Sequence, residues 1–99
     1  MEIIGKKQEA KLTISLIGML NTMSSPMLEE YINKNLDDVE ELVFDFEKLE
    51  YITSSGLRVL LRAQKRMNQQ GKMVIVHMNS EIREVFELTG FLDMMTILE

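Results

Sequence analysis

The order of elements is decided by residues 42–77, which read LVFDFEKLEYITSSGLRVLLRAQKRMNQQGKMVIVH. Residues 42–46 form a short apolar run with aromatic and β-branched side chains, which is typical of a central strand. Residues 54–70 carry apolar side chains at helical spacing, and Gly71 follows as a C-cap glycine would. Residues 72–77 are again nearly continuous in apolar side chains, which predicts a strand buried on both faces. The stretch therefore predicts a β-α-β unit with parallel strands and a right-handed crossover.

A loop is expected between the first of these strands and the helix, with Leu49 and Ile52 anchoring it in the core. The helix is expected to begin at Ser54 or Ser55, where Gly56 lets the backbone turn tightly. Its core-facing side chains are predicted to be Leu57, Leu60, Leu61, Gln64 and Met67.

The residues before this unit predict two strands and a helix. Residues 2–9 are expected to form an edge strand, and residues 11–17 alternate polar and apolar side chains as a half-buried strand does. Gly18 is expected to end that strand. A helix is then predicted to begin at residues 24–26, SSP, where a serine hydroxyl would cap the free amides and proline would occupy the first turn.

The residues after the unit predict one more helix and one more strand. Ser80 is expected to begin the helix, Gly90 to end it, and residues 95–98 to form the last strand. The predicted order is therefore β-β-α-β-α-β-α-β. We expect residues 1–99 to form a single α/β domain, with a mixed sheet of about four to five strands and helices packed mainly on one face.

The composition excludes several classes of protein. A chain of 99 residues has room for one core, and a net charge of -5 argues against nucleic acid as the main partner, because phosphate backbones call for a basic surface. Cysteine is absent, so neither a disulfide framework nor a thiolate metal site is expected. No apolar run reaches the roughly 18 residues of a membrane helix, and the N-terminus lacks the order of a signal peptide. We therefore expect a cytoplasmic protein without membrane insertion.

The residues that catalysis requires are sparse. His77 is the only histidine, and at a strand end it is interpreted either as a ligand or base or as a ring with satisfied hydrogen bonds. The carboxylates Asp45, Glu47 and Glu50 are interpreted as a solvated strand end rather than a catalytic pair. No nucleophile elbow, dinucleotide fingerprint or P-loop is present. We expect no enzymatic activity, no metal and no cofactor.

Ser54 supports two interpretations, since it lies where a helix is expected to begin. In the first, its hydroxyl or that of Ser55 caps a free amide of the first turn, which contributes about 0.5–2 kcal/mol. In the second, a phosphate on Ser54 carries about -1.5 to -2 charges and faces the positive end of the helix. The fold would then persist, while a partner packed over the loop would be expelled. The residues alone leave both interpretations open.

Two neighbouring groups of residues are candidates for a binding surface. Met19, Met23 and Met27 surround the loop after the second strand, and methionine is common both in cores and on adaptable binding surfaces. The central helix also has a basic side, which is either a solvated face or a patch that steers an acidic partner. Its members are Arg58, Arg62, Lys65 and Arg66.

The run from Asp45 to Leu60, which reads DFEKLEYITSSGLRVL, resembles the signature of STAS domains. Gly18 and Leu20, before the predicted helix start, and residues 89–91, TGF, also fit the family. The central motif is specific and the flanking ones are weak. The resemblance covers essentially the whole chain, and it is nearest to the stand-alone anti-sigma factor antagonists.

This resemblance implies a partner-switching role. In that family the unphosphorylated antagonist binds an anti-sigma factor that is also a serine kinase, which releases the sigma factor. Phosphorylation of the serine just before Ser-Gly or Ala-Gly ends the complex, and a phosphatase restores it. That serine corresponds to Ser54, with Thr53 and Ser55 as second choices. Many members have aspartate where this chain has Thr53, so an acid is missing from the kinase target and a hydroxyl is added.

The predicted interaction surface surrounds the loop before the central helix. Its residues are Met19, Asn21, Met23, Thr53, Ser54, Ser55, Gly56, Leu57 and Arg58. Two other functions stay open: a non-switching STAS subunit of a membrane transporter complex, with Ser54 only as a cap, and a sensor that binds an anion or nucleotide at the loop.

Overall fold

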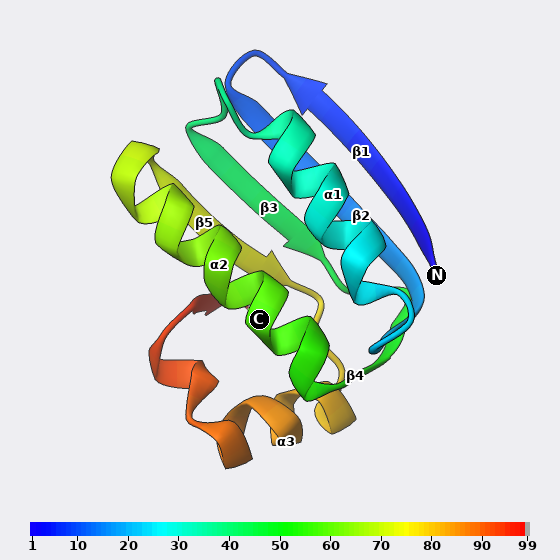
Figure 1. Ribbon diagram of the computed structural model, residues 1–99. Helices are drawn as coiled ribbons and strands as arrows, with labels where there is room; N and C mark the ends of the chain where they lie inside the picture. The colour runs from blue at the N-terminus through cyan, green and yellow to red at the C-terminus, as the bar shows by residue number, and fades with distance from the viewer. Residues whose placement is uncertain (99) are drawn as a thin grey trace.

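The computed structural model describes residues 1–98, and a mixed β-sheet forms its centre (Figure 1). Its strands are β1 (Glu2–Gln8), β2 (Lys11–Leu20), β3 (Glu41–Asp45), β4 (Leu49–Ile52), β5 (Lys72–Val76) and β6 (Thr96–Leu98). The helices are α1 (Ser25–Asn35), α2 (Ser54–Gln70), α3 (Ser80–Thr89) and a short 3-10 helix, η1 (Phe91–Asp93). The strands lie in the order β1-β2-β3-β5-β6, with β1 antiparallel to β2 and the other neighbours parallel.

Helices α1 and α2 lie side by side across one face of the sheet, and α3 lies at one end of it, against β4 and η1 (Figure 1). This arrangement confirms the predicted α/β domain with a mixed sheet and helices mainly on one face. The core between the layers includes Phe44 and Phe46, whose ring centroids are 6.3 Å apart, and Phe86 of α3. None of the helices within residues 1–98 combines the length and apolar character that a bilayer span requires.

The two faces of the sheet differ in burial, because the helices cover only one of them. Along β2, buried and half-buried side chains alternate as the period of two predicts. Along β5, Met73 and Ile75 are buried, whereas Val74 and Val76 are only half-buried. The prediction that this strand is buried on both faces is therefore wrong, since no helix of the described residues covers its second face.

Strand β2 is longer than predicted, because Gly18 bends it and does not end it. Gly18 has a φ of 105°, which glycine adopts readily, and the register against β4 shifts between Gly18 and Met19. Beyond this irregularity β2 pairs in parallel with β4, a segment that the sequence predicts as a loop. Leu49 and Ile52 are buried at the two ends of β4, which confirms them as core anchors.

The core-facing side of α2 is wider than its helical spacing predicts. Leu61, predicted to face the core, is only half-buried, whereas Val59 and Ala63 are buried as well. The wider face follows from the position of α2, which packs against both the sheet and α1. The buried residues of α2 are Gly56, Leu57, Val59, Leu60, Ala63, Gln64 and Met67.

Candidate functional site

The candidate site lies where α2 begins, next to the carboxyl ends of β2 and β4. Thr53 immediately precedes the helix, and its amide donates a hydrogen bond to the Leu20 carbonyl oxygen at 3.0 Å. Its carbonyl oxygen accepts a bond from the Leu57 amide, also at 3.0 Å. Gly56 allows the helix to approach the sheet closely, because a Cβ atom there would lie 2.6 Å from Leu20 Cγ. The start of α2 is therefore held rigidly against β2.

The three consecutive hydroxyls at this helix start differ in accessibility. The Thr53 Oγ1 atom is buried and has no hydrogen-bond partner among the described residues. Ser55 is half-buried, and its Oγ lies 3.1 Å from Thr22 Oγ1. Ser54 is exposed, and within residues 1–98 no hydrogen bond engages its side chain. Ser54 is thus the hydroxyl of the three that is both exposed and unengaged.

The capping interpretation of Ser54 and Ser55 is wrong. Thr53 holds the cap position of α2, and its side chain makes no cap hydrogen bond. Both serines already lie within the helix, so their hydroxyls do not occupy the place from which a cap acts. The amides of the first turn are consequently not satisfied by a side-chain cap.

The loop between β2 and α1, residues 21–24, is organised by Asn21. Its Oδ1 atom accepts hydrogen bonds from the Met23 amide at 3.0 Å and from the Ser24 amide at 3.1 Å. Ser24 Oγ donates to the Met19 carbonyl oxygen at 2.8 Å and accepts from the Asn21 amide at 2.9 Å. Ser24 holds the predicted cap position of α1, but the predicted hydroxyl cap is wrong, because its side chain bonds back into the loop and not to the amides of α1.

The three methionines around this loop lie on the surface. Met19 is 47% exposed, Met23 is 88% exposed and Met27 is 45% exposed. Together with Met1, Asn21 and Ser24 they line a shallow hollow of about 420 Å³. Core filling is therefore excluded for them, and the adaptable-surface interpretation is the one that matches their exposure.

Two of the four residues on the basic side of α2 are paired with acids of α1 and the segment after it. Arg62 forms an ion pair with Glu29, and Arg66 forms one with Asp37 at 2.7 Å. Arg58 lies one turn after Ser54 and is exposed. Gly56 and Leu57 are buried, so they support the surface from beneath and do not present side chains on it.

His77 and Asp45 come together where β3 and β5 end, a proximity that the sequence does not predict. His77 Nδ1 lies 2.9 Å from Asp45 Oδ1. This hydrogen bond, and the charge of Asp45, raise the pKa of His77 above its usual value. Burial raises the pKa of Asp45, but hydrogen bonds from His77 and from the Glu47 amide outweigh it, so the pKa is lowered overall. The ring is thus engaged by a carboxylate and, within residues 1–98, no hydrogen bond connects it to Ser54.

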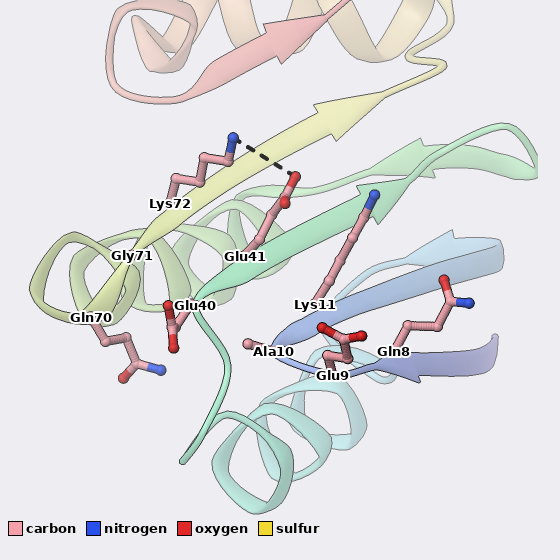
Figure 2. A pocket seen from close by; sticks show the side chains of 9 residues that line it. All are labelled: Gln8, Glu9, Ala10, Lys11, Glu40, Glu41, Gln70, Gly71 and Lys72. Carbon is pink, nitrogen blue, oxygen red and sulfur yellow. Dashed lines mark ion pairs between the residues drawn. The ribbon is translucent and has the colours of Figure 1, made fainter.

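A depression at the opposite end of the sheet contains none of the predicted site residues (Figure 2). Its volume is about 510 Å³, and it lies where α2 ends and β5 begins. Acids and lysines alternate around it, with Lys72 Nζ 4.0 Å from Glu41 Oε2, so its lining has no single sign of charge. It is lined by Gln8, Glu9, Ala10, Lys11, Glu40, Glu41, Gln70, Gly71 and Lys72.

Comparison with known proteins gives matches along almost the whole chain. The family described as STAS domain matches residues 3–99. BtrV of Bordetella bronchiseptica, which is named as an anti-sigma factor antagonist, is 34% identical over 99 residues that cover 98% of this chain and 85% of the relative. The anti-sigma-B factor antagonist of Staphylococcus aureus is 30% identical, over 83% of this chain and 78% of its own.

A solved structure of the Bacillus cell-fate determinant SpoIIAA in its phosphorylated form has the same fold. It superimposes with a TM-score of 0.76 at 19% sequence identity, covering 99% of this chain and 92% of that one.

Proposed function

Because this chain belongs to the STAS domain family, we propose that it is an anti-sigma factor antagonist whose binding to its partner is switched by phosphorylation of Ser54. Support for the antagonist role comes from relatives of that name at 34% and 30% identity. The observation that carries the switch is local: Ser54 is the exposed and unengaged hydroxyl of three in a row at the start of a long helix.

A kinase needs a hydroxyl that it can reach, and this requirement favours Ser54 over its neighbours. Thr53 Oγ1 is buried, so phosphorylation there would require the start of α2 to leave β2. Ser55 Oγ is already hydrogen-bonded to Thr22, so its phosphorylation would break the contact between loop and helix. Phosphate on Ser54 displaces neither contact. We therefore place Thr53 and Ser55 second.

The position of Ser54 also suits a phosphate electrostatically. It occupies the first turn of α2, where free backbone amides and the helix dipole favour negative charge. We expect the modified domain to keep its fold, and the change to lie in the surface that a partner meets.

The surface that the partner meets consists of the Asn21-ordered loop and the start of α2. Met19 and Met23 supply exposed apolar side chains, and the contact of Thr22 with Ser55 holds the loop beside the helix. A dianion on Ser54 would introduce charge at an interface whose apolar contacts require exclusion of water. Arg58, exposed on the same helix, completes the surface.

The proposed partners are an anti-sigma factor with serine kinase activity, which binds the unmodified chain, and a phosphoserine phosphatase, which restores it. In this role the chain is a cytoplasmic binding protein and not an enzyme, without cofactor, direct nucleic-acid contact or membrane insertion.

The experiment is a pull-down from the native cell with the wild-type chain, Ser54→Ala and Ser54→Asp. We expect wild type and Ser54→Ala to recover the same anti-sigma factor, and Ser54→Asp to recover at least about tenfold less, a loss of about 1.4 kcal/mol in binding. The recovered kinase and ATP should add one phosphate to wild type, by intact mass, and none to Ser54→Ala.

Equal binding of Ser54→Asp and wild type would show that the switch does not act at Ser54. Recovery of a transporter component in place of an anti-sigma factor would instead overturn the antagonist role. Circular dichroism of all three proteins checks that any loss of binding occurs in a folded domain.

A further inference from the structure

A second cluster of polar side chains lies where β3 and β5 end. Asp45 is the last residue of β3, Glu47 follows in the next turn, and His77 comes directly after β5. These two strands are parallel neighbours, with Asp45 in register with Val76, so their carboxyl ends bring the three side chains together. One nitrogen or oxygen atom of each lies within 4.8 Å of those of the other two.

Hydrogen bonds and the backbone hold this cluster in place. Asp45 Oδ1 accepts a hydrogen bond from the Glu47 amide at 3.0 Å, and His77 Nδ1 lies 2.9 Å from the same oxygen atom. The Asp45 side chain is 25% exposed, so it is fixed more firmly than a surface carboxylate. The backbone of His77 has a φ of 61°, an uncommon value for a residue other than glycine.

Within residues 1–98, neither carboxylate of the cluster forms an ion pair with lysine or arginine. Five other acids form such pairs, whereas Asp45 is paired with His77 and Glu47 forms no ion pair. A hollow of about 170 Å³ lies beside the two carboxylates; Ser15 and Lys48 also line it, whereas His77 does not. It has room for the waters that would complete the coordination of an ion held by Asp45 and Glu47, since each water occupies about 30 Å³.

We propose that Asp45, Glu47 and His77 form a binding site for a divalent transition-metal ion, with Zn²⁺ as its expected occupant. An imidazole nitrogen with two carboxylate oxygens suits Zn²⁺ better than Mg²⁺ or Ca²⁺, which prefer oxygen ligands alone. Ligand atoms of a tetrahedral zinc ion lie about 3.4 Å apart. Without metal, His77 Nδ1 and Asp45 Oδ1 are hydrogen-bonded at 2.9 Å, so the ion would replace the shared proton and the two atoms would separate by about 0.5 Å. The exposed Glu47 side chain is free to supply the third ligand.

The fourth position of the ion would be held by water, as in open zinc sites. The ion would join the ends of two neighbouring strands. The site shares no residue with the interaction surface around Ser54. Failure of either proposal would therefore leave the other unaffected.

The test is a titration of the chelator-stripped 1–99 chain with Zn²⁺ by isothermal calorimetry, alongside NMR of the imidazole protons. His77 is the only histidine, so a single ring resonance reports on the site. The variants are His77→Asn, which tolerates the positive φ, and Glu47→Gln. Glu87→Gln, an exposed acid on α3, is the control with the same change of charge as Glu47→Gln.

We expect one Zn²⁺ per chain, a shift of the His77 resonance, and binding at least about tenfold weaker in both site variants, since even residues that only orient ligands contribute that much. Glu87→Gln should bind as wild type does, and excess Mg²⁺ should not displace the ion. Absence of saturable binding, unchanged affinity in Glu47→Gln, or displacement by Mg²⁺ would each overturn the site. Thermal melts without metal verify that the variants are folded.

Discussion

Thr22 Oγ1 and Ser55 Oγ lie 3.1 Å apart, and this contact joins the β2–α1 loop to the first turn of α2. It adds a side-chain hydrogen bond to the backbone bond between Thr53 and Leu20, which already places the start of α2 against the end of β2. A neutral hydrogen bond of this kind contributes only about 0.5–1.5 kcal/mol to stability. Its larger consequence is positional, since it keeps Met23 and Ser54 on one surface.

The Thr22–Ser55 contact can be measured with a double-mutant cycle. Thr22→Val removes the hydroxyl at nearly constant volume, and Ser55→Ala removes its partner. We expect each change to lower the free energy of unfolding by about 1 kcal/mol, and the pair to lower it by less than the sum. Urea unfolding of the four proteins gives the coupling energy. Strictly additive losses would show that the two hydroxyls do not interact.

Substitution of Ser54 is expected to leave stability almost unchanged. Its side chain is exposed and forms no hydrogen bond within the described residues, so Ser54→Ala should alter the free energy of unfolding by no more than about 0.5 kcal/mol. Ser54→Asp should be equal to wild type or slightly more stable, because a negative charge is favourable in the first turn of a helix. Thermal melts at low ionic strength test both. A marked loss in Ser54→Asp would mean that phosphorylation acts on the fold itself.

Replacement of Asn21 is expected to loosen the β2–α1 loop. Asn21→Ala removes the acceptor for the amides of Met23 and Ser24, so we expect a loss of about 1–2 kcal/mol in the free energy of unfolding. Backbone amide relaxation should show increased motion at residues 21–24, while α3 is unaffected. Partner binding should weaken as well, because the ordered position of Met23 is lost. Unchanged relaxation in the variant would contradict this account of the loop.

The fold is largely readable from the sequence, because its strongest elements carry local signals. The alternation along β2 and the helical spacing of α2 each reflect burial of one side of the element. This burial appears directly in the order of apolar and polar residues along the chain. The sequence does not predict β4, since its four residues are buried only at their two ends and show no period of two. It predicts a strand end at Gly18, because a glycine at a bulge and one at a terminus look alike in a sequence.

Part of the candidate site can be predicted from neighbouring residues, and part depends on contacts between residues far apart in the chain. Ser54 belongs to a contiguous motif, so the sequence predicts its place at the start of α2. The contact between Thr22 and Ser55 forms only because the end of β2 lies against the start of α2, and the contact between Asp45 and His77 forms only because β3 pairs with β5. Burial of Thr53 Oγ1 likewise depends on the β2–α2 contact and has no signal in its neighbours.

Two glycines offer a test of how close packing constrains this fold. A Cβ atom at Gly71 would overlap the Glu40 carbonyl oxygen, which also accepts a hydrogen bond from the Lys72 amide at 3.0 Å. A Cβ atom at Gly5 would overlap only the hydroxyl end of Tyr31, a flexible side chain on α1.

Because backbone cannot yield as a side chain can, we expect Gly71→Ala to lower the free energy of unfolding by at least about 2 kcal/mol. Gly5→Ala should cost less than about 1 kcal/mol, since Tyr31 can swing aside and alanine is the better strand residue. Urea unfolding of both variants, with Gly90→Ala as a case of strain without overlap, separates the two causes. Equal losses at Gly5 and Gly71 would show that the position of Tyr31 is as fixed as the backbone at Glu40.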